Sequence, residues 1–265
     1  MTAPRLHVLT ATDAETAVVL RRGPTDVVAS MGWNRGADEF EMGQWVRGRI
    51  YEHRADLSPD GRHMIYFVYR GAQSRGVTVL SRAPWLRAIA AYPQSHTWHG
   101  GGAFTEEDRV FLNGSAARED LPDGLLPALP DALPHGTDGF HMGALYAATQ
   151  VRRGWRSDNV PSTGVGLWRD LSNGWKLEQT IRIGARNRAL LSSAYALVKP
   201  GVDRRDMPAW TWADVWRDGL HYAADGGLWF ARVSADGSLS DTREIHDFSS
   251  MSFEAIAAPY DRVEA

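Results

Sequence analysis

Short β-rich runs separated by Asp-Gly turns constrain this sequence more than any other feature does. Between residues 212 and 245, four such runs are joined by turns at Asp218-Gly219, Asp225-Gly226 and Asp236-Gly237. Aspartate hydrogen-bonds its own backbone in a turn, and glycine accepts the positive φ that many turns need. Four short strands in about forty residues have the size of one β-propeller blade. The sequence therefore predicts an all-β fold of propeller type.

Earlier segments show the same pattern less completely. Residues 50–93 predict a second unit, in which the turn Pro59-Asp60-Gly61 leads into an aromatic and aliphatic strand. A third unit opens at residue 97 and ends near residue 113. The segment at about 115–163 is rich in Pro, Leu, Asp and Gly at its start and is predicted to be an irregular insertion.

The blade count depends on residues 140–205. We expect five blades if this segment forms one of them and four if it is insertion, and five is favoured. The β-rich run at 252–257 lies one strand beyond the complete late unit. Strands from both termini that close one ring would hide two exposed sheet edges. We therefore expect a single domain over residues 1–265, closed in this way, with a two-sheet β-sandwich as the alternative.

Composition excludes several classes of protein. The chain has 265 residues, no cysteine and a formal net charge of -3. Without cysteine it has no disulfide and no thiolate metal ligand. The balanced charge, without a basic stripe, argues against a nucleic acid partner. No apolar run reaches the about eighteen residues of a membrane span, and no signal peptide pattern follows Met1. We expect a cytoplasmic protein with no membrane partner.

The turn Ser58-Pro59-Asp60-Gly61 and its following strand resemble the blade turn of TolB-like and WD40-like propellers. The late unit matches that pattern in part, and a regular Trp-Asp or Gly-His signature is absent. Together with Arg49-Ile50-Tyr51-Glu52 and Trp98-His99-Gly100-Gly101-Gly102, the turn also resembles a group of uncharacterised bacterial proteins. The resemblance implies a propeller fold and no particular activity, because this fold hosts enzymes, lectins and scaffolds alike.

Two histidines flank the start of the glycine-rich run. On a strand His96 and His99 would face opposite sides, which suits metal chelation poorly. On a loop they could converge, with His135 or His141 as a third ligand. The three glycines allow either a close approach of the backbone to a ligand or a tight bend. We favour a glycine-rich innermost strand with solvated histidines, keep ligand contact as the alternative, and assign no metal site.

The run from Arg49 to Asp56 is predicted to be a strand with polar side chains on both faces. Alternation places Arg49, Tyr51 and His53 on one face and Glu52, Arg54 and Asp56 on the other. An ion-pair network between blades is the favoured interpretation. The alternative is a pair of carboxylates for glycoside hydrolysis. The second carboxylate would then come from another blade, and the candidates are Glu178, Asp214 and Glu254.

Three tryptophans, Trp210, Trp212 and Trp216, are predicted to share one face of a strand. A packed layer between blades is favoured over a platform that stacks on a ligand.

Motifs for nucleotide, metal or acyl-transfer chemistry are absent from the sequence. The favoured function is a non-catalytic binding propeller that uses one rim and the channel mouth for a small molecule or a protein partner. The alternative is a small propeller enzyme, a hydrolase or lyase, carbohydrate-directed or metal-assisted. The candidate catalytic residues are His99, Glu52, Asp56 and His141. The candidate ligand-binding residues are Arg49, Tyr51, His96, Trp98, Trp212 and Glu254. The sequence identifies no cofactor.

Overall fold

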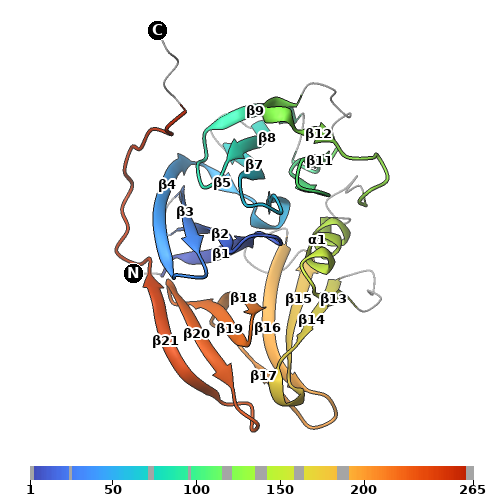
Figure 1. The fold of residues 1–265 in the computed structure, drawn as a ribbon, viewed down its shortest axis with the longest axis vertical. Helices are drawn as coiled ribbons and strands as arrows, with labels where there is room; N and C mark the ends of the chain where they lie inside the picture. The colour runs from blue at the N-terminus through green and yellow to red at the C-terminus, as the bar shows by residue number, and fades with distance from the viewer. Residues whose placement is uncertain are drawn as a thin grey trace. The chain divides into compact units, whose positions relative to one another are not determined.

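The computed structural model describes residues 3–23, 26–70, 75–94, 97–114, 121–134, 142–157, 164–183 and 191–260. The chain divides into two compact units. One contains residues 1–7 and 146–251 and is called here the 146–251 unit. The other contains residues 8–145 and 252–265 and is called the 8–145 unit. Both consist mainly of antiparallel sheets whose strands follow one another along the chain (Figure 1).

The first half of the chain forms three sheets. The first has the order β1 (Arg5–Thr10), β2 (Thr16–Arg22), β3 (Val27–Asn34) and β4 (Glu39–Arg47). The second has the order β5 (Arg49–Ile50), β7 (His63–Arg70), β8 (Arg75–Arg82) and β9 (Ala88–Gln94), with β6 (Asp56–Leu57) also paired to β7. The third has the order β10 (Gly102–Phe104), β11 (Arg109–Leu112) and β12 (Leu126–Pro127). Single 3-10 turns, η1 (Glu52–Arg54) and η3 (Pro122–Gly124), join these strands.

The second half contains one helix and two sheets among its described residues. The helix is α1 (Met142–Arg152). The fourth sheet has the order β13 (Arg156–Ser157), β14 (Gly164–Asp170), β15 (Lys176–Ile183), β16 (Leu191–Lys199) and β17 (Asp203–Asp206), with the turn η4 (Ser172–Gly174) before β15. The fifth has the order β18 (Trp210–Trp216), β19 (Gly219–Ala224), β20 (Gly227–Val233) and β21 (Leu239–Asp247).

The four-stranded unit predicted at residues 212–245 is confirmed as the fifth sheet. Two of its turns use the expected residues, with φ of 52° at Asp225, 87° at Gly226 and 82° at Gly237. The first turn differs, because Arg217 rather than Gly219 takes a positive φ, of 53°. The all-β class is therefore confirmed where the turn pattern was clearest.

Closure by strands from both termini is not confirmed. Residues 251–258 form no strand, and in the described part of the chain no sheet combines strands from the two ends. The C-terminal residues are instead held by side chains, since Gln44 Nε2 donates to the carbonyl of Ile256 at 2.8 Å. The described strands form five sheets, so the two-sheet sandwich is wrong. The number of blades stays a prediction.

The segment predicted as an irregular insertion, 115–163, holds more structure than expected. Its described part includes η3, β12, α1 and β13. Leu145, Tyr146 and Thr149 are buried in α1, at the spacing of one helical face. The helix escaped prediction because a short apolar run is compatible with either a buried strand or a buried helix.

Apolar side chains pack between sheets that are neighbours along the chain. In the 8–145 unit, Val18, Leu20 and Val28 of the first sheet join Met64 and Tyr66 of the second in one buried cluster. A further cluster joins the second and third sheets. In the 146–251 unit, one cluster spans the fourth and fifth sheets and is capped by α1. Burial of these interfaces is the main stabilising contribution.

A β-bulge overturns the prediction that three tryptophans share a face. The register with β19 shifts between Trp210 and Trp212, so that Thr211 is the extra residue. Because an extra residue inverts the side-chain alternation, Trp210 joins the buried cluster with Tyr222, whose ring lies 4.6 Å away. Trp212 and Trp216 lie on the opposite face. The hydroxyl of Thr211 donates to the carbonyl of Leu6 at 3.0 Å and accepts from its N–H at 3.2 Å.

Candidate functional site

The run predicted as one strand from residue 49 to residue 56 is interrupted by the 3-10 turn η1. The N–H of Arg54 donates to the carbonyl of Tyr51 at 2.8 Å, which closes this turn. A 3-10 turn repeats every three residues, so residues 51 and 54 lie on the same side of it. The predicted alternation along this run is therefore wrong, and Arg54 joins Tyr51 instead of opposing it.

Two guanidinium groups approach the ring of Tyr51. The Cζ atom of Arg49 lies 4.6 Å from the ring centre, and that of Arg54 lies 5.2 Å from it. Arg54 also lies 5.1 Å from the ring centre of Phe67, and the two aromatic rings are 5.5 Å apart. Cation–π contacts of this kind stabilise a guanidinium that has left water. We call Arg49, Tyr51 and Arg54 the two-arginine site.

Arg54 connects the two sequence runs that contain the candidate catalytic residues Glu52, Asp56 and His99. Its side chain is buried, and Nη1 donates to the carbonyl oxygens of Thr97 at 2.7 Å and His99 at 3.0 Å. The glycine-rich run therefore begins as a loop over Arg54, and its strand, β10, starts only at Gly102. Residues 97–101 therefore form a loop and not a strand, which is the second of the two conformations considered for the histidine segment.

Glycine is required where this loop crosses Arg54. Gly101 has a φ of +77°, and a Cβ atom there would lie 2.3 Å from the carbonyl oxygen of Arg54. Gly100 has a φ of +106°, and its Cβ atom would lie 2.3 Å from the ring of Phe67. The N–H of Gly101 donates to Thr78 Oγ1 at 2.8 Å. The glycines thus permit a close backbone approach, but the groups approached are Arg54 and Phe67 of the protein itself, and contact with a ligand stays a prediction.

The two-arginine site has donors that the described residues do not satisfy. Arg54 Nη2 and Arg49 Nε are both buried, and neither has a hydrogen-bond acceptor among the described residues. No described carboxylate forms an ion pair with either guanidinium. Burial lowers the pKa of Arg54 to about 10; Tyr51 opposes this change and Arg49 adds to it. At neutral pH the buried guanidinium therefore keeps its positive charge.

The two carboxylates predicted in this run are engaged with protein groups. The buried Asp56 accepts from the N–H of Leu57 through Oδ1 at 3.0 Å and from the N–H of Phe104 through Oδ2 at 2.8 Å. Glu52 Oε2 lies 3.4 Å from Arg22 Nη1. Asp56 thus ties β6 to β10. Of the ion-pair network favoured for this run, the structure shows the pair of Arg22 and Glu52.

Other predicted residues take no part in the contacts given above for the two-arginine site, or lie outside the described residues. His96 and His141 belong to the latter, as does His135. Trp98 is 48% exposed on the loop that covers Arg54, and Glu254 is exposed in the C-terminal segment. Trp212 is buried in the 146–251 unit. The suggested second carboxylates are also engaged, Glu178 with Arg204 at 2.6 Å and Asp214 with Arg169 at 2.5 Å.

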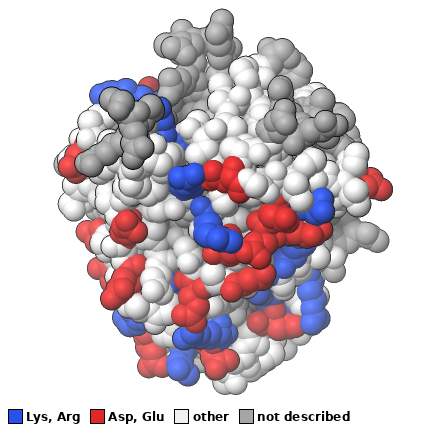
Figure 2. All heavy atoms as spheres, turned by 45° about the horizontal axis from the view of Figure 1, so that its top comes forward, with Lys and Arg blue, Asp and Glu red and all other residues white. Residues whose placement is uncertain are grey.

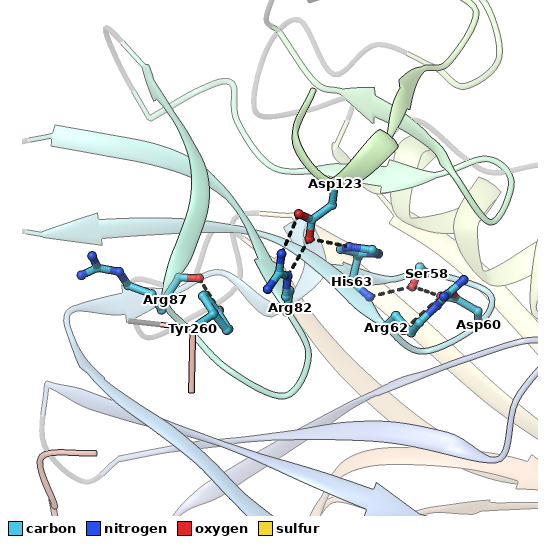
Figure 3. Close-up of polar contacts among 8 residues, drawn as sticks. All are labelled: Ser58, Asp60, Arg62, His63, Arg82, Arg87, Asp123 and Tyr260. Carbon is cyan, nitrogen blue, oxygen red and sulfur yellow. Dashed lines mark hydrogen bonds and ion pairs between the residues drawn. The ribbon is translucent and has the colours of Figure 1, made fainter. Parts of the chain in front are cut away.

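A second polar cluster, which sequence reasoning missed, joins the β7–β8 hairpin to η3 (Figure 3). Arg82 donates to Asp123 through Nε at 2.6 Å and Nη2 at 2.8 Å, and His63 Nε2 lies 3.2 Å from Oδ2 of the same carboxylate. The hydrogen bond from Arg82 lowers the pKa of Asp123 to about 2, and His63 contributes. The guanidinium of Arg82 also lies 5.1 Å from the ring centre of Tyr260. These groups satisfy one another, so the cluster is a clamp between elements.

The predicted Pro-Asp-Gly turn is confirmed beside this clamp (Figure 3). Ser58 Oγ donates to Asp60 Oδ1 at 2.5 Å and accepts from the N–H of His63 at 2.9 Å. Gly61 takes a φ of 76°. The serine and aspartate side chains therefore supply the local hydrogen bonds that define this turn.

Basic and acidic side chains are interspersed on the face drawn in Figure 2, and metal-ligand residues form no cluster in the described part of the chain. The basic side chains on that face form no continuous stripe. Within residues 3–260, outside the gaps given above, no group of three or more His, Asp or Glu residues is arranged to hold a metal ion. The same residues contain no helix with the length and apolarity that crossing a bilayer requires.

Comparison with known proteins gives distant structural likenesses. No protein-family model matches the chain, and no curated protein sequence matches it. Among solved structures, an uncharacterized protein from Listeria monocytogenes EGD-e is 8% identical with a TM-score of 0.33, covering 94% of this chain and 85% of its own. The acylaminoacyl peptidase of Pyrococcus horikoshii is 8% identical with a TM-score of 0.35, covering 92% of this chain and 45% of its own.

The β-propeller domain of the Trilobed protease from Pyrococcus furiosus is 9% identical with a TM-score of 0.30, covering 91% of this chain and 83% of its own. Likenesses at this level carry no inference about activity or blade number. The function has to be argued from the site itself.

Proposed function

We propose that this protein is a non-catalytic binding protein that takes a small anionic ligand at the two-arginine site. The proposal depends on two buried donors, Arg54 Nη2 and Arg49 Nε. Neither donor has a hydrogen-bond acceptor among the described residues. A buried donor without an acceptor costs about 1–3 kcal/mol, and a buried charge without a partner costs more. A phosphate or carboxylate group supplies both the acceptor oxygens and the opposite charge.

The surroundings of the site support a small ligand. Arg49 and Tyr51 are half-buried, so a ligand approaches from their side, whereas Arg54 is held from behind by the loop carbonyls. Trp98 is exposed on that loop, and we include it in the proposed contact surface. His99, whose carbonyl holds Arg54, belongs to the same proposed contact surface.

The geometry of the carboxylates supports binding over hydrolysis. A general acid or base has to reach the substrate with a free carboxyl oxygen. Both oxygens of Asp56 accept backbone N–H groups inside the protein, and Glu52 faces Arg22. Neither carboxylate of the 49–56 run therefore offers the free oxygen that glycoside hydrolysis needs.

The proposal is tested by thermal unfolding of the wild type, Arg49→Gln and Arg47→Gln in phosphate, sulfate, acetate and citrate at constant ionic strength. Arg47 is an exposed control two residues earlier, stacked 4.6 Å from the ring centre of Phe253. An anion at a hundred times its Kd stabilises the folded state by about 2.7 kcal/mol. We expect at least one anion to raise the Tm of the wild type and of Arg47→Gln, and to lose most of this effect on Arg49→Gln.

Two outcomes contradict the proposal. One is a wild type that responds to none of these anions beyond the effect of ionic strength. The other is an Arg49→Gln protein whose Tm rises as much as that of the wild type. Arg49→Lys adds a graded test, because lysine keeps the charge but loses the planar fork that binds an oxyanion through two donors. It should bind with intermediate affinity.

A further inference from the structure

The two-arginine site holds two positive charges close together, and their number constrains the ligand. The guanidinium carbons of Arg49 and Arg54 lie 4.6 Å and 5.2 Å from the centre of the same ring, that of Tyr51. Arg54 is buried and Arg49 is half-buried. Like charges repel each other more strongly where water is partly excluded. A ligand that balances only one of these charges leaves the other uncompensated beside it.

The carboxylates that lie close to this site in the sequence are engaged by other groups. Glu52 lies 3.4 Å from Arg22, and Asp56 accepts backbone N–H groups through both of its oxygens. In the part of the chain that the structure describes, no carboxylate forms an ion pair with Arg49 or Arg54. Both positive charges therefore remain for a ligand to balance.

The donors of the site come from two different side chains. Nη1 of Arg54 is occupied by the carbonyl oxygens of Thr97 and His99, and Nη2 is a buried donor without a described acceptor. Arg49 adds its buried Nε. A phosphate group has three acceptor oxygens and up to two negative charges. A single carboxylate has two oxygens and one charge, so it balances one guanidinium and leaves the other.

We infer that the ligand of the two-arginine site carries a doubly charged tetrahedral group, which in a small metabolite is a phosphate monoester. Each guanidinium then balances one negative charge and donates to the same group. The inference rests on the proposed binding function and narrows its ligand from any small anion to a dianion. A single negative charge on a group of the same shape binds more weakly.

The first test compares sulfate with methanesulfonate by calorimetric titration of the full chain at pH 7.5 and constant ionic strength. The two anions have the same tetrahedral shape and similar size, but sulfate carries two charges and methanesulfonate one. We expect sulfate to bind at least about tenfold more tightly. Arg49→Gln should lose this preference, Arg49→Lys should keep it because lysine keeps the charge, and the exposed control Arg47→Gln should leave it unchanged.

The second test changes the charge of one ligand by pH. A phosphate monoester has a second pKa of about 6, so methyl phosphate is a monoanion at pH 5 and a dianion at pH 8. Arginine stays protonated over this range, including Arg54, because burial lowers its pKa only to about 10. The other charged or titratable groups on η1, on β6, on the loop over Arg54 and in the ion pair beside them are Arg22, Tyr51, Glu52, His53, Asp56 and His99.

Sulfate is the control for those groups of the protein. It stays a dianion from pH 5 to pH 8, so a titration of the protein changes the binding of both probes, and their ratio reports the charge of methyl phosphate. We expect methyl phosphate to weaken about tenfold relative to sulfate from pH 8 to pH 5, because about a tenth of it is doubly charged one pH unit below its second pKa.

Three outcomes overturn the inference. They are equal affinity for methanesulfonate and sulfate, a constant ratio of methyl phosphate to sulfate between pH 5 and pH 8, and tighter binding of succinate, whose two charges are on separate carboxylates, than of sulfate. Each of them leaves the proposed function in place if the anion that binds is lost in Arg49→Gln. Failure of every anion to bind instead overturns the proposed function itself, and the narrower inference with it.

Discussion

Arg82 donates two hydrogen bonds to the carboxylate of Asp123, from Nε to Oδ2 at 2.6 Å and from Nη2 to Oδ1 at 2.8 Å. The arginine ends β8 of the second sheet, and the aspartate lies in η3, directly before the short strand of the third sheet. A two-point pair of this kind fixes orientation as well as distance. It makes the junction between these two sheets of the 8–145 unit dependent on one carboxylate.

Replacement of Asp123 by asparagine should therefore remove a pH-dependent part of the stability. The carboxyl has a pKa of about 2 in the folded protein, against an ordinary value of 3.8. A lowered pKa contributes stability that is present above the ordinary value and is lost as the pH falls through 2. Asparagine also accepts the φ of 57° found here, so the backbone is kept.

We expect Asp123→Asn to lower the free energy of unfolding by about 1 kcal/mol at pH 7, a modest value because the pair is close to water and screened. Urea unfolding of both proteins from pH 7 to pH 2 measures the difference. It should shrink steadily below pH 4. A difference that is the same at pH 2 as at pH 7 would show that the charge of Asp123 is not what stabilises the junction.

Two glycines with similar backbone angles allow a matched test of the loop over Arg54. Gly101 and Gly124 have φ of +77° and +73°, but a Cβ atom at Gly101 would lie 2.3 Å from the carbonyl oxygen of Arg54, whereas nothing lies within 4 Å of one at Gly124. Alanine at either position bears the cost of a left-handed backbone, about 1–2 kcal/mol. Only Gly101→Ala adds a clash, which costs about 1–3 kcal/mol more.

Chemical unfolding should therefore rank Gly101→Ala well below Gly124→Ala in stability, with Gly124→Ala modestly below the wild type. Because Arg54 has to move if the loop moves, Gly101→Ala should also weaken anion binding at the two-arginine site. Equal stability of the two variants would mean that the loop relaxes around the new Cβ atom without loss of stability. Close packing over Arg54 would then not be what holds the loop in place.

Substitution of Asp56 distinguishes a structural role of the 49–56 run from a catalytic role. In Asp56→Asn, one of the two backbone N–H groups of Leu57 and Phe104 has to face an amide nitrogen instead of an oxygen. A buried donor left without an acceptor costs about 1–3 kcal/mol. We expect a loss of stability of this size in urea unfolding, and a much smaller one for the less buried Glu52→Gln.

A catalytic Asp56 would behave differently. Its replacement would abolish a detectable hydrolase or lyase activity while leaving the unfolding curve in place, and His99→Ala would do the same. An unchanged unfolding curve for Asp56→Asn therefore speaks against the structural role, whichever activity is assayed.

Local chemistry determined the parts of this protein that could be predicted from its sequence. The Ser58–Asp60 turn and the turns at Asp225-Gly226 and Gly237 depend on side chains and φ values within a few residues, so the sequence alone predicts them. The all-β class and the four-stranded sheet at 210–247 follow from these turns. The sequence did not predict that the Arg49 run contacts the glycine-rich run, and the residue that makes this contact, Arg54, was assigned to the wrong face.

Tertiary structure decided what depends on groups distant along the chain. The bulge at Thr211, whose hydroxyl holds Leu6, turns Trp210 and Trp212 to opposite faces, and a count of residues along one strand does not reveal such an insertion. Burial of Arg54 depends on how separate segments pack. From the sequence alone, a charged residue is expected to be exposed to solvent. Only the packing of its neighbours shows whether the protein supplies its hydrogen-bond partners or leaves its donors available for a ligand.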